Sequence, residues 1–219
     1  MTRGILIAGN ESTLSAALAL EAGKRVERFC AAFVPNHLQT TPPAANRQGP
    51  IPLAWNPGSP VSARTLALAA ENQLGQITEA ILICTPPAVR KNAADLNPAN
   101  IEIIVNDYIK GWFFLVKELA SVFKARKAGA LALVLADTSG GGGRDDPDLI
   151  GPSVAASFHA FAQALMASSQ TEPYDVYGFA VPTGDDTNAG AFVFKTLEDS
   201  KRNAGKWHKF GSRLPFLGR

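Results

Sequence analysis

The chain has 219 residues, of which 46% are hydrophobic and 18% charged, and its formal net charge is +2. This composition fits one globular domain, residues 1–219, and excludes a disordered chain. Apolar runs are too short to cross a bilayer and no signal-peptide pattern is seen, so we expect a cytoplasmic protein with no membrane span. Cys30 and Cys84 form neither a CxxC pair nor a disulfide framework, so no metal site is expected.

Basic residues are concentrated at the C-terminal end. Residues 195–219 carry seven basic side chains against Glu198 and Asp199, about +5 in all, which leaves about −3 for the rest of the chain. Aromatic residues alternate with lysines there, at Lys206, Trp207, His208, Lys209 and Phe210. This pattern is typical of binding to nucleic acid or another anionic surface, and also of an edge strand protected by its charges.

Hydrophobic periodicity predicts strands and helices that alternate along the whole chain. The expected strands are Gly4–Ala8, Val26–Val34, Ile51–Trp55, Ala80–Cys84, Leu131–Asp137, Val176–Val181 and Gly205–Phe210. The expected helices are Thr13–Gly23, Ser59–Gly75, Ile101–Ala125, 152–169 and Ala191–Lys201, with loops over Asn36–Pro50 and Ala88–Ala99. This order predicts an α/β protein, a doubly wound parallel sheet in three α/β/α layers.

The helix that starts near Pro152 has two different faces. An apolar stripe contains Val154, Phe158, Phe161 and Leu165, whereas the opposite side contains the small residues Ala156, Ala160 and Ala167 beside Gln163. The stripe is expected to pack on the sheet. The small face would let another helix approach closely.

Together with the strands on either side, this helix resembles the active-site segment of the short-chain dehydrogenases/reductases. The resemblance implies a Rossmann-like fold that binds NAD(P). In that family the helix carries Tyr-x-x-x-Lys, but here Val154 takes the place of the Tyr and Phe158 that of the Lys. The residues four positions after the three tyrosines are Trp112, Gly178 and Val181, so no alignment restores the motif.

The cofactor motifs of the family are also degenerate. Its T-G-x-x-x-G-x-G pattern aligns with Ala8, Gly9, Thr13 and Ser15, and the side chains of Thr13 and Ser15 would crowd the phosphates. The resemblance implies vestigial cofactor-binding positions at Gly9, Asn10, Thr13, Ser15 and Asn56, the last in place of an Asp beside the adenine. The family's N-N-A-G becomes Cys84, Thr85, Pro86 and Pro87.

The remaining catalytic positions are changed as well. Tyr108 stands where the family has a proton-relaying Asn, and Asp137, Thr138 or Ser139 stands where it has the catalytic Ser. The substrate lid is shortened to Asp185–Gly190. His37 and His159 are most simply a loop histidine and a structural histidine.

Three functions follow as hypotheses. Loss of motifs favours a protein without dehydrogenase activity or bound cofactor, which acts as a structural or partner-binding oligomer. The first alternative is a divergent NAD(P)-dependent oxidoreductase with non-standard residues, and the second is an anionic-surface or nucleic-acid binder through the basic C-terminus. Binding of nucleic acid is the weaker interpretation of that segment.

The sequence also predicts how copies of the chain would associate. Val105, Ile109, Trp112, Val116, Leu119 and Phe123 form the stripe expected to lie on the sheet, with Tyr108, Leu115 and Val122 on its flank and Phe114 nearly opposite. An outward Phe is unexplained in a monomer. We therefore expect a homodimer or larger oligomer, or a complex with an active homologue, through helices 101–125 and 152–169, with Phe114 and Ala160 near the axis.

Overall fold

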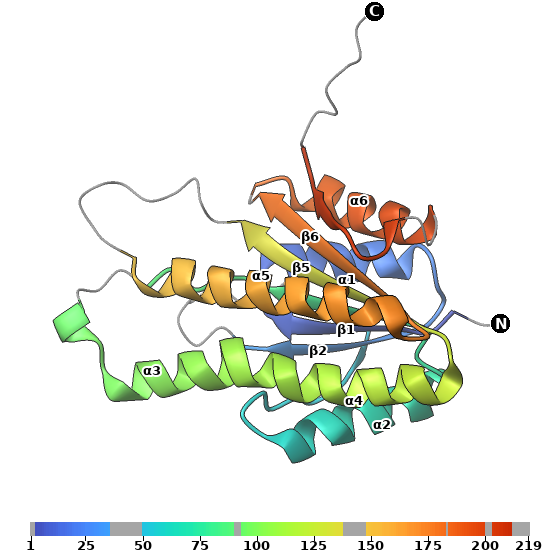
Figure 1. The fold of residues 1–219 in the computed structure, drawn as a ribbon, viewed down its shortest axis with the longest axis horizontal. Helices are drawn as coiled ribbons and strands as arrows, with labels where there is room; N and C mark the ends of the chain where they lie inside the picture. The colour runs from blue at the N-terminus through green and yellow to red at the C-terminus, as the bar shows by residue number, and fades with distance from the viewer. Residues whose placement is uncertain are drawn as a thin grey trace, which may run out of the picture.

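The computed structural model describes residues 3–35, 50–89, 93–137, 148–182, 184–199 and 203–211, except for the side chain of Asp137. These residues form a parallel sheet of seven strands in the order β3-β2-β1-β4-β5-β6-β7 (Figure 1). The strands are β1 (Ile5–Asn10), β2 (Phe29–Val34), β3 (Ile51–Pro52), β4 (Glu79–Cys84), β5 (Ala130–Asp137), β6 (Asp175–Pro182) and β7 (Trp207–Lys209). The predicted doubly wound α/β fold is confirmed.

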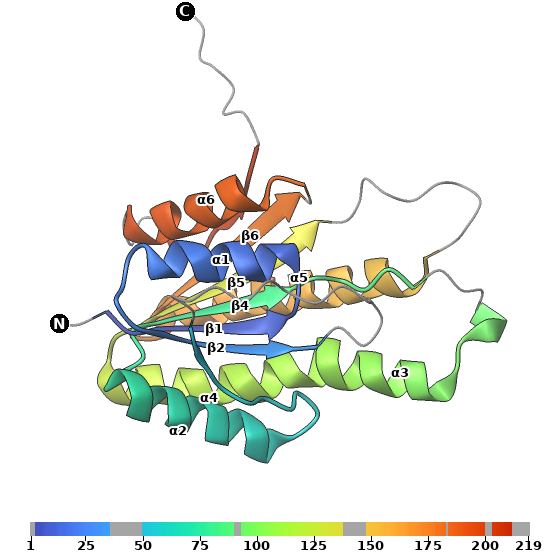
Figure 2. The same ribbon diagram turned by 180° about the vertical axis from the view of Figure 1, so that it is seen from behind.

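Helices cover both faces of this sheet, as Figures 1 and 2 show from opposite sides. On one face lie α1 (Thr13–Gly23) and α6 (Asp186–Glu198), and on the other lie α2 (Pro60–Leu74), α4 (Gly111–Arg126) and α5 (Ile150–Ser168). Each face has its own apolar core, because alternate side chains of every strand point to opposite sides. None of the described helices is long and apolar enough to cross a membrane.

The first unit of the chain forms where the sequence predicts it. β1 is completely buried, and α1 spans Thr13–Gly23 as expected. Ser12 caps α1 by accepting a hydrogen bond from the Ser15 N–H. α1 also packs against α6. A Cβ at Gly190 of α6 would lie only 3.3 Å from the carbonyl oxygen of Ala17 in α1.

Three strands are shorter than the sequence pattern indicates, among them β7, which covers Trp207–Lys209 of the predicted Gly205–Phe210. β2 starts at Phe29 and not at Val26, because the N–H of Val26 still bonds to the Ala22 carbonyl at the end of α1. β3 has two residues at the edge of the sheet, where a Pro such as Pro52 is tolerated, and beyond it the Leu53 N–H still bonds to the Ala31 carbonyl of β2. Residues 36–49 of the predicted loop, with His37, lie outside the described part of the chain.

The long predicted helix consists of three pieces. It begins earlier than expected as α3 (Pro98–Val105), capped by Asn97, and a π-helical turn, η2 (Asn106–Lys110), joins α3 to α4. A 3₁₀ turn, η1 (Ala93–Asp95), interrupts the predicted loop before it. A π turn holds an extra residue, so the face upstream of it rotates relative to a continuous α-helix.

This rotation corrects the predicted face of the helix. Upstream of α4 the buried side chains are Ile104 and Tyr108, whereas Val105 is exposed and Ile109 half-buried. Within α4 the stripe of Trp112, Val116, Leu119 and Phe123 is buried as predicted, and Leu115 joins it. Phe114 is half-buried against the core, and the outward ring is Phe113, which is 54% exposed.

α5 begins at Ile150, two residues before the expected Pro152. The carboxylate of Asp148 accepts hydrogen bonds from the N–H groups of Ile150 and Gly151, so this residue caps the helix start. The face on the sheet continues from Val154 and Phe158 to Ala162 and Met166, whereas Phe161 and Leu165 are only half-buried. Phe161 packs against Phe113 of α4, with 4.4 Å between ring centroids.

The chain passes from β6 to α6 with three residues between Pro182 and Asp186. α6 begins five residues before the predicted Ala191, and the Ala189 N–H bonds to the Asp185 carbonyl. Asp186 lies in the first turn of α6, where an acidic side chain stabilises the start of a helix. The apolar pattern of the sequence did not reveal this start. Most of the segment predicted as a shortened lid, Asp185–Gly190, therefore belongs to α6.

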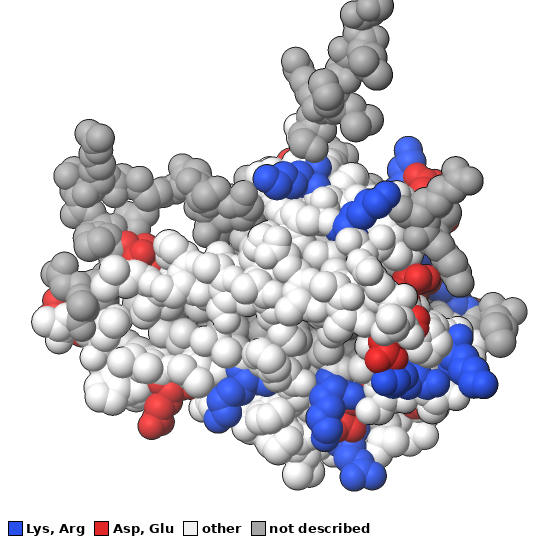
Figure 3. Space-filling view, in the orientation of Figure 1, with Lys and Arg blue, Asp and Glu red and all other residues white. Residues whose placement is uncertain are grey.

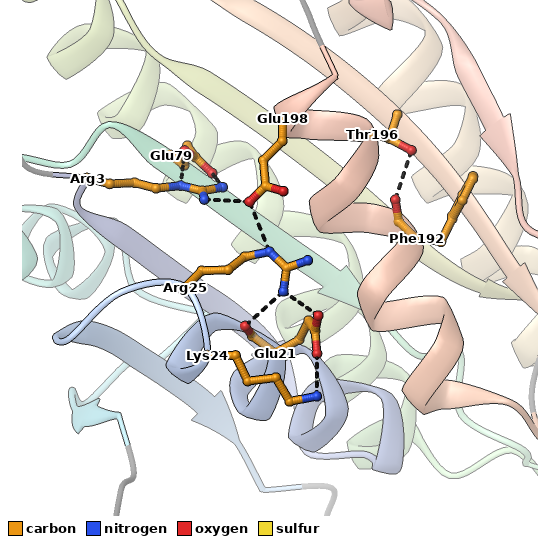
Figure 4. A network of polar contacts seen from close by, with 8 residues as sticks. All are labelled: Arg3, Glu21, Lys24, Arg25, Glu79, Phe192, Thr196 and Glu198. Atoms are coloured by element: carbon orange, nitrogen blue, oxygen red, sulfur yellow. Dashed lines mark hydrogen bonds and ion pairs between the residues drawn. The ribbon is translucent and has the colours of Figure 1, made fainter.

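Ion pairs join the amino ends of β1 and β4 to the carboxyl ends of α1 and α6 (Figure 4). Arg3 binds both carboxylate oxygens of Glu79 at 2.6 and 2.8 Å, and its third nitrogen binds Glu198 of α6 at 2.7 Å. Glu198 also accepts from Arg25 at 2.9 Å, and Arg25 in turn pairs with Glu21 of α1. The network thus joins residue 3 to residue 198.

Candidate functional site

The strand order places a topological switch point between β1 and β4. The connection after β1 leads through α1 to one face of the sheet, and the connection after β4 leads through α4 to the other. Ligands of open α/β sheets bind at such a point, outside the carboxyl ends of the strands. The sequence-predicted residues from Gly9 to Ser15, Asn56, Tyr108 and Val154 approach this edge from different elements.

Gly9 is required by the packing of the sheet itself. A Cβ at this position would lie 2.4 Å from the Ile83 carbonyl oxygen of β4. The glycine therefore has a structural reason for its presence whether or not a nucleotide binds. Asn10, the next residue, is 2% exposed and ends β1.

Side chains occupy two backbone N–H groups at the N-terminus of α1, those of Ser12 and Ser15. The Ser15 hydroxyl accepts the Ser12 N–H at 2.8 Å, and the Ser12 hydroxyl accepts the Ser15 N–H at 3.0 Å, which completes a reciprocal capping box. The Thr85 hydroxyl after β4 donates to Ser12 Oγ at 3.1 Å. Thr13 is exposed. The sequence suggested that Ser15 stands in the crevice, but its side chain points into the helix turn.

Asn56 forms a local turn. Its side-chain oxygen accepts the Gly58 N–H at 3.0 Å, and its own N–H donates to the Ser62 hydroxyl at 2.8 Å. This Asx turn leads into α2, which Ser59 caps. The side chain predicted beside an adenine therefore has a structural partner already.

Val154 and Phe158 lie in the core, as predicted. Each is 1% exposed. The Phe158 ring meets Trp112 edge-on at 5.4 Å between centroids, and Trp112 contacts Trp55 at the same separation. Phe158, which aligns with the Lys of the family, thus belongs to an aromatic cluster, which we call the Trp55 cluster (Trp55, Trp112 and Phe158).

Tyr108 is a buried phenol. Burial raises its pKa well above the ordinary value, and the nearby Cys84 and Asp107 act in the same direction. Burial likewise raises the pKa of the Cys84 thiol. A phenol that donates a proton in catalysis needs the opposite shift. Asp137 ends β5 opposite Pro182, and Thr138 and Ser139 lie outside the described residues.

His159 and the basic edge have structural partners. The His159 ring packs edge-on against Trp207 of β7 at 4.4 Å between centroids, and the His208 ring lies 5.4 Å from Phe179. His208 also bonds through Nε2 to the Asn203 carbonyl at 2.8 Å. Alternation along an edge strand therefore accounts for the pattern at residues 206–210.

Sequence reasoning missed several residues that shape this edge. Thr85 and Trp55 become important through contacts with residues far along the chain, at Ser12 and Trp112. A Ser-x-x-Ser pattern could have indicated the capping box at Ser12 and Ser15, by analogy with Ser/Thr-x-x-Glu. Within the described residues, no group of three His, Cys, Asp or Glu side chains could hold a metal ion.

Strand order, the two helical layers and the β1–α1 turn define the fold of the short-chain dehydrogenases/reductases. No protein-family model matches this chain, and no curated protein sequence matches it. Levodione reductase has a TM-score of 0.76 at 12% identity, over 95% of each chain. A short-chain type dehydrogenase/reductase from Mycobacterium marinum has a TM-score of 0.74 at 12% identity, over 94% of this chain and 92% of its own.

The NADH-dependent reductase A1-R′, solved with NAD, has a TM-score of 0.67 at 16% identity, over 98% of each chain. At these identities the likeness establishes the fold. The scaffold is thus one that NAD-binding oxidoreductases share. The fold expected from the resemblance of the sequence is confirmed.

Proposed function

We propose that this chain is a protein of the short-chain dehydrogenase/reductase fold that has no dehydrogenase activity and acts through association with a second copy or with an active homologue. The observation that carries the proposal is the packing of Val154 and Phe158, which fill the positions of the catalytic Tyr and Lys with buried apolar side chains. Carbonyl reduction on this scaffold needs a phenol with a lowered pKa beside an ammonium group. Neither group is available at these positions.

The described residues at the turn from β1 to α1, where a dinucleotide would bind in this fold, fit a dinucleotide poorly. Phosphate binds at a helix N-terminus through free backbone N–H groups. Here the N–H of Ser12 donates to the Ser15 hydroxyl, and the N–H of Ser15 donates to the Ser12 hydroxyl. Glu11, with its carboxylate, directly precedes the N-cap residue Ser12. A negative charge at this place opposes a pyrophosphate. We therefore derive no catalytic step through NAD(P).

The outer face of α4 and α5 supports association. Phe113 is 54% exposed and packs on Phe161, and the neighbouring helix presents small exposed residues at Ala156, Ala160 and Ala167. Figure 3 shows this face largely free of charge, with Lys and Arg side chains near its border. An apolar face rimmed by polar residues is typical of a protein interface. We place Phe113, in place of the predicted Phe114, beside Ala160 at its centre.

Light scattering at micromolar concentration tests this association. Wild-type protein is expected to have at least the mass of a dimer, and Phe113→Glu to lower it to that of a monomer. Leu68→Glu is a matched control, because Leu68 of α2 is also 54% exposed and lies outside the proposed face. A monomeric wild-type protein would refute association with a second copy.

The second candidate is a divergent NAD(P)-dependent oxidoreductase. The observation that favours it is the switch point itself, with the N-terminus of α1 at the carboxyl edge of the sheet. Titration with NADH and NADPH, followed by fluorescence and calorimetry, separates the two candidates. Saturable binding would favour the oxidoreductase, and we expect none.

A further inference from the structure

Three buried polar atoms have no hydrogen-bond partner among the described residues. They are the side-chain oxygen Oδ1 of Asn10 and the indole Nε1 atoms of Trp55 and Trp112. Two are donors and one is an acceptor. Buried polar groups in folded proteins are nearly always hydrogen-bonded, to protein or to ordered water, so each of these atoms requires an explanation.

Sheet register places two of these residues, Asn10 and Trp55, at one end of the same face. Leu6 and Ala8 of β1 belong to the core under α2, α4 and α5, so alternation puts Asn10 on that face too. Asn10 pairs with Val34, and the ladder from β2 to β3 continues through the Leu53 N–H to the Ala31 carbonyl. Two residues further, Trp55 comes level with Asn10.

α4 completes the arrangement from above. Its Trp112 ring lies 5.4 Å from the Trp55 ring, centroid to centroid. β1 and β2 contribute the small side chains Ala8 and Ala32 to the same core.

We propose that this end of the sheet holds an internal water site, in which water accepts hydrogen bonds from Trp55 and Trp112 and donates one to Asn10. Water matches the set, since it offers two lone pairs and two protons. The guest is small and uncharged because the three atoms are buried, where a charge without a partner is costly. The Trp55 cluster is thus a hydrated core site and not a dry one. This inference does not depend on the proposed function.

Nuclear magnetic resonance of the full-length protein labelled with ¹⁵N tests the site. The chain has three tryptophans, so the indole region contains three signals, which single Trp→Phe variants assign. Magnetisation transfer from water is expected to the Trp55 and Trp112 indole protons, although these protons exchange slowly with D₂O. Trp207, which is half-buried and outside the cluster, is the control and should exchange faster.

A nearby hydroxyl could relay magnetisation without bound water, and Tyr108 is buried in the same core. The transfer should therefore persist in Tyr108→Phe. A crystal structure should in addition show density within hydrogen-bond distance of both indole nitrogens and Asn10 Oδ1. Loss of transfer in Tyr108→Phe, or a core without such density, would overturn the proposal.

Discussion

Phe158→Lys, which restores one catalytic residue of the family, should strongly destabilise the protein. The Phe158 side chain is 1% exposed and packs edge-on against Trp112. Truncation of a buried Phe costs about 3–5 kcal/mol, and an ammonium group in the same place adds a desolvation cost. Because the net stability of a domain is about 5–15 kcal/mol, this change removes a large part of it.

Urea unfolding followed by tryptophan fluorescence measures the effect, because Trp112 reports directly on the site. A loss of about 4 kcal/mol with a slope of about 2 kcal/mol/M lowers the midpoint by about 2 M. Leu68→Lys places the same side chain at an exposed position of α2 and should change the stability by no more than about 0.5 kcal/mol.

The destabilisation of the Phe158→Lys variant should also depend on pH. Burial lowers the pKa of the introduced ammonium group below its value in the unfolded chain. The full penalty is therefore present below the folded-state pKa and decreases as the pH rises through it. Equal midpoints for Phe158→Lys and Leu68→Lys would refute the reasoning. Turnover of NADPH with a simple carbonyl by the Val154→Tyr, Phe158→Lys double variant would refute the non-catalytic interpretation.

The remaining predictions concern the network, the sheet and the thiols. Burial alone would raise the pKa of Glu198, but its pairs with Arg3 and Arg25 outweigh burial and lower it. Glu198→Gln should therefore cost at most about 1 kcal/mol of stability at pH 7, and less as the pH falls through the lowered pKa. Melting temperatures of the two proteins from pH 7 to pH 3 would show this. A pH-independent difference would contradict this. Gly9→Ala should lower the free energy of unfolding in urea by about 2 kcal/mol or more, because the new Cβ would meet the Ile83 carbonyl. Wild-type stability of this variant would exclude that clash. Cys30 and Cys84 are buried, so a thiol reagent at pH 8 should modify neither in native protein and both after unfolding.

Most of the fold could be predicted because its signals are local. Ser12 and Gly23 mark the ends of α1 in the sequence, and buried strands such as β4 are short apolar runs. The face of the α3–α4 helix could not be predicted in the same way. Its rotation depends on the π turn at Asn106–Lys110, and a π turn has no residue pattern that distinguishes it from an α-helix of the same composition.

The apolar residues at the candidate site could be predicted from the sequence, but its long-range contacts could not. Val154 and Phe158 follow from the spacing of an apolar stripe, which local periodicity reveals. The bond from Thr85 to Ser12 spans 73 residues, and the contact of Trp55 with Trp112 joins a loop to a helix. Such pairs arise when the sheet brings distant segments to one edge. A single sequence does not record them.

The packing of α1 against α6 has a consequence for biosynthesis. α1 leaves the ribosome early, but the helix that covers its apolar side follows about 160 residues later. Until then the side of α1 that approaches α6 at Ala17 has no neighbour, and the ion pair between Arg3 and Glu198 is unmade. A nascent chain that has not yet reached α6 is therefore an aggregation-prone intermediate, and the domain completes its folding only after this helix has emerged.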